Sequence, residues 1–241
     1  MKRWAIYIDI EGTSKIYEAQ EAQFYIALDA LVTALCQIST IVFPESPSRL
    51  FLHRVGADGA LIVSEFAEGQ LETPISIAVV LMQVIIANGF VGKAGISDGS
   101  FADVKSSFPT LRSFPEQTDA TSKCAEWLLT AFPVMGTALI NAHRLGTCKP
   151  RGARLAVDAT IMTNIPEGVV ISYKDKDVAV VDWIHTQTRM VEEIISKTHI
   201  QLPSRESFRE TLRNYVATTG DTTDGEWKHY TLCLNGLHDH R

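Results

Sequence analysis

Cysteine is scarce in this sequence. The 241 residues contain four, at positions 36, 124, 148 and 233, and no two of them form a CxxC pair. Scattered thiols are typical of a reduced intracellular protein and not of a disulfide framework. We therefore expect free thiols and a cytoplasmic location.

An excess of positive charge is also lacking. The formal net charge at pH 7 is −6. Proteins that bind duplex nucleic acid usually carry a basic face, so we expect no duplex nucleic acid as a partner. A small anionic ligand could still bind in a locally positive pocket.

The most apolar run of the sequence is expected to be too short to span a bilayer. The most apolar stretch runs from Ile75 to Ile86 and contains Ser76 and Gln83. Because a spanning helix needs about 20 apolar residues, this stretch is predicted to be a buried helix. The first residues, MKRWAIYIDIEG, reach two carboxylates too early for a signal peptide. No membrane association is expected.

Strand and helix patterns alternate through most of the chain. The pattern predicts a strand at 4–10, a helix at 16–38, a hairpin around the Gly-Ala-Asp-Gly turn, a helix between Pro74 and Gly89, and a strand ending at Gly99. It then predicts a loop at 104–118, helices at 118–132 and 136–148, strands within 153–159 and 169–183, helices near 184–199 and 204–216, and a polar tail.

This order predicts an α+β fold. A ferredoxin-like core, in which helices cover one face of a mainly antiparallel sheet, is one good candidate. We assign residues 1–183 to one domain and residues 184–241 to a helical C-terminal extension.

Two aspartates lie at the ends of predicted strands. Asp9 ends the first strand, and Asp58 lies in the turn of the hairpin that would run beside it. Asp9 could simply start a turn, since Asp and Gly are common turn residues. Gly12, Thr13 and Ser14 open the next helix, where free N–H groups favour phosphate. Paired carboxylates can hold Mg²⁺ or Mn²⁺ together with substrate phosphates, and such a cation activates an attacking oxygen.

Four segments resemble the motifs of class III nucleotide cyclases, in the order that the family has them. YIDIEGTS resembles the family's DIEGFT motif, and HRVGADGALIVSEF resembles its KxxGDGxLAxF hairpin. GKAGISDG is similar to RxGIxxG, and GTALINAHRLGTCKPRGARLAVDAT is similar to GxxVNxAARLxxxAxPGxIxVSxxT. The resemblance covers roughly residues 4 to 183.

The resemblance implies a role for each matched position. Asp9 and Asp58, with the carbonyl of Ile10, would bind Mn²⁺ or Mg²⁺, and residues 12–14 would form the phosphate loop. Arg144 matches the arginine that stabilises the pentacovalent phosphate. In that family one chain of a head-to-tail homodimer supplies the metal ligands and the other supplies the arginine, so the expected partners are a second copy and a nucleoside triphosphate.

The positions that recognise the base differ from the family. The family's ribose-binding asparagine aligns with Ile140, and Asn141 lies next to it. Arg54 replaces the base-selecting lysine, and its partner aspartate falls near Pro133. Arg54 could donate two hydrogen bonds to the carbonyls of uracil. In this respect the chain resembles the pyrimidine cyclases of bacterial Pycsar anti-phage systems, which make cyclic UMP or cyclic CMP for a separate effector.

Two alternatives remain open. The chain could be a purine cyclase, or a cyclase-like module that has lost activity and serves in binding. Lys174 and Lys176 could contact the triphosphate, although alternating charges at a strand turn are usually just solvated. His53 and His143 are predicted to be structural.

Overall fold

The structure is a computed structural model of the chain. It describes residues 2–45, 48, 50–56, 58–66, 71–103, 122–124, 127–129, 134–148, 151–218 and 225–237. For residues 13–20, 54, 102–103, 122–124, 127–129 and 134–135 only the backbone is described. The predicted loop at 104–118 lies outside these ranges.

The first half of the chain folds as a ferredoxin-like βαββαβ unit. Its elements are β1 (Arg3–Ile10), α1 (Thr13–Gln37) with a short π-helix after it (Ile38–Val42), β2 (Leu50–Val55), β3 (Gly59–Ser64), α2 (Glu72–Ala87) and β4 (Gly92–Gly99). The strands lie in the order β4-β1-β3-β2, and each neighbouring pair is antiparallel. The predicted ferredoxin-like core is confirmed by this strand order.

Three further strands extend the sheet. β9 (Leu155–Asp158) pairs parallel to β4, and β11 (Val178–Val181) and β10 (Ile171–Lys174) follow it outward, which gives seven strands in all. The result is the mixed α+β fold that the sequence predicted. The helix α5 (Thr137–Thr147) confirms the helix expected at 136–148.

The helix predicted at 118–132 is wrong in the part that the structure describes. There the chain forms two short antiparallel strands, β6 (Ser122–Cys124) and β7 (Trp127–Leu129). A short apolar run does not distinguish a strand from a helix by periodicity alone. A second small pair joins β5 (Ala102–Asp103) to β8 (Val134–Met135).

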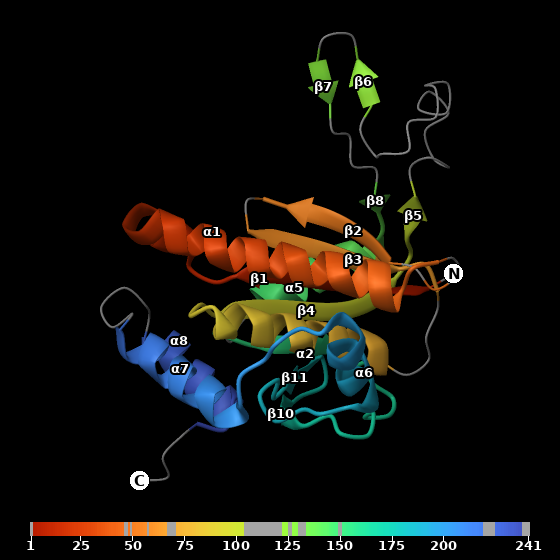
Figure 1. Cartoon of the computed structure of the whole chain (residues 1–241). Helices are drawn as coiled ribbons and strands as arrows, with labels where there is room; N and C mark the ends of the chain where they lie inside the picture. The colour runs from red at the N-terminus through yellow and green to blue at the C-terminus, as the bar shows by residue number, and fades with distance from the viewer. Residues whose placement is uncertain are drawn as a thin grey trace.

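The alternation of side chains along β1 divides the core into two layers. Ile6 and Ile8 belong to the large hydrophobic core that also contains the buried stripes of α1 and α2, whereas Ala5 and Tyr7 pack with α5 on the other face. In Figure 1, α1 crosses in front of the sheet and α5 lies behind it. Helices therefore cover both faces of the sheet near β1.

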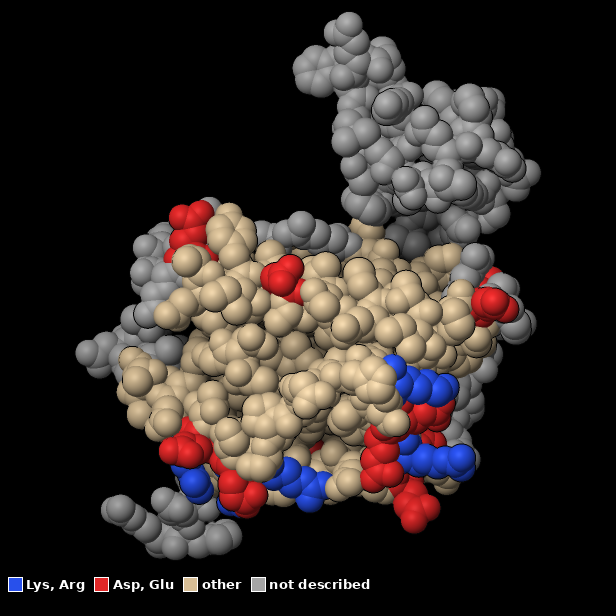
Figure 2. Space-filling view, in the orientation of Figure 1, with Lys and Arg blue, Asp and Glu red and all other residues tan. Residues whose placement is uncertain are grey.

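Two helices are unusually apolar, for different reasons. α2 is buried from Thr73 to Ile86 because it contacts the sheet, α1 and two C-terminal helices, α6 (Arg189–Thr198) and α7 (Arg205–Thr218). Within the described residues one stretch, Glu21–Val42, is long and apolar enough to cross a membrane by length and composition. One stripe of this stretch packs into the core, and Tyr25 and Ile26 face outward. Figure 2 shows that the surface over α1 carries few charged side chains.

The C-terminal helices share the core of the sheet. They are α6 (Arg189–Thr198), α7 (Arg205–Thr218) and α8 (Gly225–Leu234). α6 and α7 match the two predicted helices, but the predicted polar tail is wrong, because α8 buries Trp227, Thr231 and Leu234. These apolar and small residues recur at the spacing of a helix face, a signal that the sequence offered.

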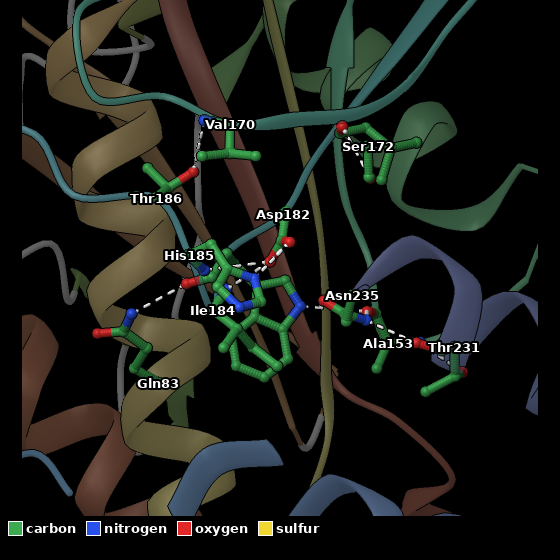
Figure 3. A network of polar contacts seen from close by, with 12 residues as sticks. Gln83, Ala153, Val170, Ser172, Asp182, Ile184, His185, Thr186, Thr231 and Asn235 are labelled. Atoms are coloured by element: carbon green, nitrogen blue, oxygen red, sulfur yellow. Dashed lines mark hydrogen bonds and ion pairs between the residues drawn. The ribbon is translucent and has the colours of Figure 1, made fainter. Parts of the chain in front are cut away.

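Hydrogen bonds connect α8 to the loop before β9. The amide of Ala153 donates to Thr231 Oγ1 at 3.1 Å, and Asn235 Nδ2 donates to the carbonyl of Ala153 at 3.0 Å. Trp183 Nε1 donates to the same carbonyl at 3.2 Å (Figure 3). The described end of the chain is thus joined to the sheet by specific polar contacts as well as by apolar packing.

Candidate functional site

Asp9 and Asp58 lie next to each other at one end of the sheet. Asp9 is the partner of Gly59 in the β1–β3 pairing, and Asp58 directly precedes Gly59. A Cβ atom placed on Gly59 would lie 3.4 Å from Asp9 Oδ1. The negative charge of Asp58 also raises the pKa of Asp9, which shows that the two carboxylates interact. The structure therefore brings these two predicted site residues together.

Burial is the main reason why the pKa of Asp9 lies above its ordinary value of 3.8, and Asp58 adds to the effect. Two neighbours act in the opposite direction. Lys93 Nζ lies 3.2 Å from Asp9 Oδ2, and Tyr7 forms a hydrogen bond with the same carboxylate. Burial of Tyr7 and the nearby charge of Asp9 raise the pKa of the Tyr7 hydroxyl, so it stays a donor at neutral pH.

Lys93 forms a second ion pair in this cluster. Its Nζ lies 2.8 Å from Glu11 Oε2. Burial alone would lower the pKa of Lys93, but the hydrogen bonds and charges of Glu11 and Asp9 raise it above its usual value. Lys93 is therefore a fixed positive charge among the carboxylates at the end of β1.

Gly12 forms the turn between β1 and α1. Its φ of 78° is in the left-handed region that favours glycine, and no side chain caps the helix that follows. The first N–H groups of a helix have no acceptor within the helix and can bind an anion at such a turn, where the sequence predicts a phosphate loop. The side chains of Thr13 and Ser14 lie outside the described part of the structure.

Arg144 is exposed on α5 and takes no part in the ion pairs that Lys93 forms with Asp9 and Glu11. No described carboxylate lies within 4.0 Å of its guanidinium, so the structure does not pair it with Asp9 or Asp58. Ile140, one turn earlier, is 66% exposed. Asn141 is half-buried. The ring centroids of His143 and Tyr7 lie 4.8 Å apart, and this ring contact agrees with the predicted structural role of His143.

The remaining predicted residues are placed as follows. Arg54 lies on β2 opposite Ala60, and its side chain is outside the described part of the structure. Lys174 and Lys176 lie at the end of β10, the edge strand, four strands from β1. Since neighbouring strands are about 4.8 Å apart, these lysines do not reach Asp9 within one chain.

The donor set fits a hard divalent cation. Asp9 and Asp58 supply carboxylate oxygens whose mutual repulsion a cation would relieve, and the carbonyl of Ile10 lies beside them in the sequence. Among the described residues no group of three or more His, Cys, Asp and Glu side chains gathers at metal-binding distance. The ligand set predicted from the sequence, two carboxylates and a carbonyl, would leave coordination positions for substrate phosphates.

Sequence reasoning missed Lys93 and Tyr7. Lys93 is opposite Asp9 in the β1–β4 pairing, and Tyr7 is two residues before Asp9 on the same face of β1. The alternation along the first strand could have identified Tyr7. Lys93 could be identified only from the order of strands in the sheet, which places β4 next to β1.

Comparisons with known proteins do not identify a family for this chain. No protein-family model matches the sequence, and no curated protein matches it. Two solved structures of a bacterial light-regulated adenylyl cyclase are similar, with 11% and 12% identity and TM-scores of 0.48 and 0.47. The alignments cover 86% of this chain and 56% and 57% of those chains, so this chain spans just over half of their length.

Proposed function

We propose that this chain is a nucleotide cyclase that converts a pyrimidine nucleoside triphosphate to its 3′,5′-cyclic monophosphate and pyrophosphate. The observation that carries the proposal is the meeting of Asp9 and Asp58 beside the glycine turn at the start of α1. The ordered resemblance of four segments to class III cyclase motifs and the ferredoxin-like strand order support it.

The chemistry requires an oxygen nucleophile and a leaving phosphate. The ribose 3′ oxygen bonds to the α-phosphorus, the bond from that phosphorus to the bridging oxygen breaks, pyrophosphate leaves, and the 3′ proton passes to solvent. Asp9, Asp58 and the carbonyl of Ile10 would hold Mg²⁺ or Mn²⁺. Such a cation, when bound, activates the attacking oxygen and stabilises the leaving group. The N–H groups after Gly12 would hold the phosphates.

Arg144 would act in a homodimer. Its exposure on α5 and the lack of a described acidic neighbour leave it able to contact a second protomer. There its permanently charged guanidinium would stabilise the charge that develops on the phosphate. Each active site would then combine the aspartates of one chain with Arg144 of the other, and a single chain would be inactive.

The choice of base rests on Arg54. An arginine at the position of the family's base-selecting lysine can donate to both carbonyls of uracil, so we propose UTP as the first substrate and CTP as the second. The same resemblance suggests a soluble, cytoplasmic enzyme whose cyclic product signals to a separate effector in anti-phage defence.

Incubating the purified protein with each of the four ribonucleoside triphosphates and Mn²⁺ tests this proposal. Cyclic UMP, with or without cyclic CMP, is the expected product. Cyclic AMP or cyclic GMP alone would replace the pyrimidine assignment with the purine one. No cyclic product from any triphosphate would favour the binding module, for which the exposed Ile140 at the ribose-binding position is the supporting observation.

A further inference from the structure

A cavity of about 280 Å³ opens beside the ion pair of Lys93 and Glu11. Its other walls come from the end of α5 and from the loop before β9, and they include Thr147, Arg151, Gly152 and Arg154. The cavity can hold a phosphate group with several waters, since each water occupies about 30 Å³.

Arg154 is the unusual residue in this wall. Its side chain is 1% exposed, yet each of its described hydrogen-bond partners is neutral. Nη2 donates to the carbonyl of Leu145 at 2.9 Å, to the carbonyl of Cys148 and to the Cys148 sulfur. A buried charge is costly unless an opposite charge compensates it.

Capping of α5 explains only part of this arrangement. A cation at the end of a helix interacts favourably with the last carbonyls, and Nη2 fulfils that role. Nη1 is buried and has no hydrogen-bond partner among the residues that the structure describes. One side of the guanidinium therefore remains unsatisfied within the described structure, in a residue that lines the cavity.

The loop that carries Arg154 is held firmly. Ala153, its neighbour, bonds through its amide to Thr231 and through its carbonyl to Trp183 and Asn235 (Figure 3). Gly152 packs so closely on Thr231 that a Cβ atom there would lie 2.9 Å from Thr231 Oγ1. The guanidinium is thus fixed in position before any ligand binds.

We propose that this cavity binds a phosphate-type anion between Arg151, Arg154 and Lys93. Of the described lining residues, Arg151, Arg154 and Lys93 are cations and Glu11 is a carboxylate. Lys93 is paired with both Glu11 and Asp9, so the two arginines supply the positive charge that these ion pairs do not offset. The anion would satisfy Arg154, and Arg151, which is exposed at the opening, would complete its binding. The inference does not depend on cyclisation. The phosphate could be free in solution or could be the terminal phosphate of a nucleotide.

Titration calorimetry without metal tests the cavity. Inorganic phosphate and pyrophosphate should bind the wild-type protein, and Arg151→Gln should weaken binding roughly 10-fold, as expected for loss of one charge-assisted hydrogen bond. Arg154→Lys keeps the positive charge but loses the planar set of N–H donors of the guanidinium, so it should also weaken phosphate binding. Lys197→Gln, which removes an exposed lysine on α6, is the matched control and should bind as the wild type does.

The source of the phosphate is tested by competition. If UTP displaces inorganic phosphate, the terminal phosphate of the nucleotide occupies the cavity; if both bind together, the cavity takes the free anion. No phosphate binding to the wild type at millimolar concentration, or equal affinity in Arg151→Gln and the wild type, would overturn the inference. If the wild type binds phosphate but forms no cyclic nucleotide, that result would count against the cyclase proposal and not against the phosphate site.

Discussion

Asp9 of β1 lies opposite Gly59 of β3, and this pairing places Asp58, the residue before Gly59, at the same end of the sheet as Asp9, where its charge raises the pKa of Asp9. The absence of a side chain at Gly59 leaves room for the Asp9 carboxylate, because a Cβ atom there would lie 3.4 Å from Oδ1. A turn residue alone would not explain a carboxylate that is buried, accepts a hydrogen bond from Tyr7 and pairs with Lys93. The simple turn-forming interpretation of Asp9 is therefore insufficient.

Replacing Asp58 with alanine should abolish turnover without unfolding the protein. Loss of one electrostatic stabiliser of a reacting phosphate costs roughly 100-fold or more in rate. The rate of cyclic nucleotide formation measures this, and size-exclusion chromatography checks that the dimer is unchanged. Asp177→Ala, which removes a solvent-exposed carboxylate from the β10–β11 turn, should leave the rate unchanged. Equal rates in the two variants would contradict the role of Asp58.

The rate should fall on the acid side of the pH–rate profile, its acid limb, at a pH above the ordinary aspartate pKa of 3.8. Burial and the charge of Asp58 raise the pKa of Asp9, and only the ionised form of Asp9 would bind the metal. Lys93 lowers this pKa, so Lys93→Met should move the limb to higher pH. Lys2→Met, which removes the exposed partner of Asp98, should not move it. A limb that stays in place in Lys93→Met would show that another group controls the profile.

Asp9 should also make the folded state less stable as the pH rises. A carboxyl whose pKa is higher in the folded than in the unfolded state binds its proton more tightly when folded, so its stabilising contribution is lost as the pH rises through the folded-state value. Asp9→Asn should therefore flatten the dependence of the unfolding free energy on pH above 3.8. Urea denaturation at several pH values measures this, and an unchanged slope would contradict the raised pKa.

Gly95 allows α5 to lie directly on β4. A Cβ atom at Gly95 would collide with the backbone of Ala142 and Gly146, so Gly95→Ala should destabilise the fold by about 1–3 kcal/mol through overpacking. Urea denaturation measures the change. Gly225→Ala is the control, because a Cβ atom there has no atom of the described residues within 4 Å. Equal stabilities of the two variants would show that α5 can shift without cost.

Two inactive variants should restore activity when mixed. If each site combines the aspartates of one chain with Arg144 of the other, a dimer of Asp58→Ala with Arg144→Ala contains one intact site. Random exchange of equal amounts should recover about a quarter of the wild-type rate, since half of the dimers are mixed and each has one of two sites. No recovery after confirmed exchange of subunits would place Arg144 in the same chain as the aspartates.

The sequence predicted the core of the fold because its signals were local and consistent. Gly12 and Gly89 mark helix ends, and the hairpin around Asp58 follows from its glycine turn. The sequence predicted that the hairpin with Asp58 lies beside the first strand, and the structure adds the register that pairs Asp9 with Gly59. The strands β6 and β7 were predicted as helix because short apolar runs fit either structure.

The residues that surround Asp9 and Asp58 were harder to predict than the proximity of the two aspartates. Lys93 reaches Asp9 across two strands that are far apart in the chain, and its role follows only from the sheet order. Arg154 resembled an ordinary strand residue in the sequence. Its unsatisfied guanidinium depends on tertiary burial between α5 and the loop that α8 holds, which no local pattern reveals.

Binding of Mn²⁺ tests the shared role of the two aspartates most directly. Titration of the wild type with Mn²⁺ in the presence of UTP, followed by electron paramagnetic resonance of free Mn²⁺, should show bound metal. Asp9→Asn and Asp58→Asn should each weaken that binding roughly 10-fold or more, while Asp177→Asn binds as the wild type does. Equal Mn²⁺ affinity in all four proteins would contradict the account.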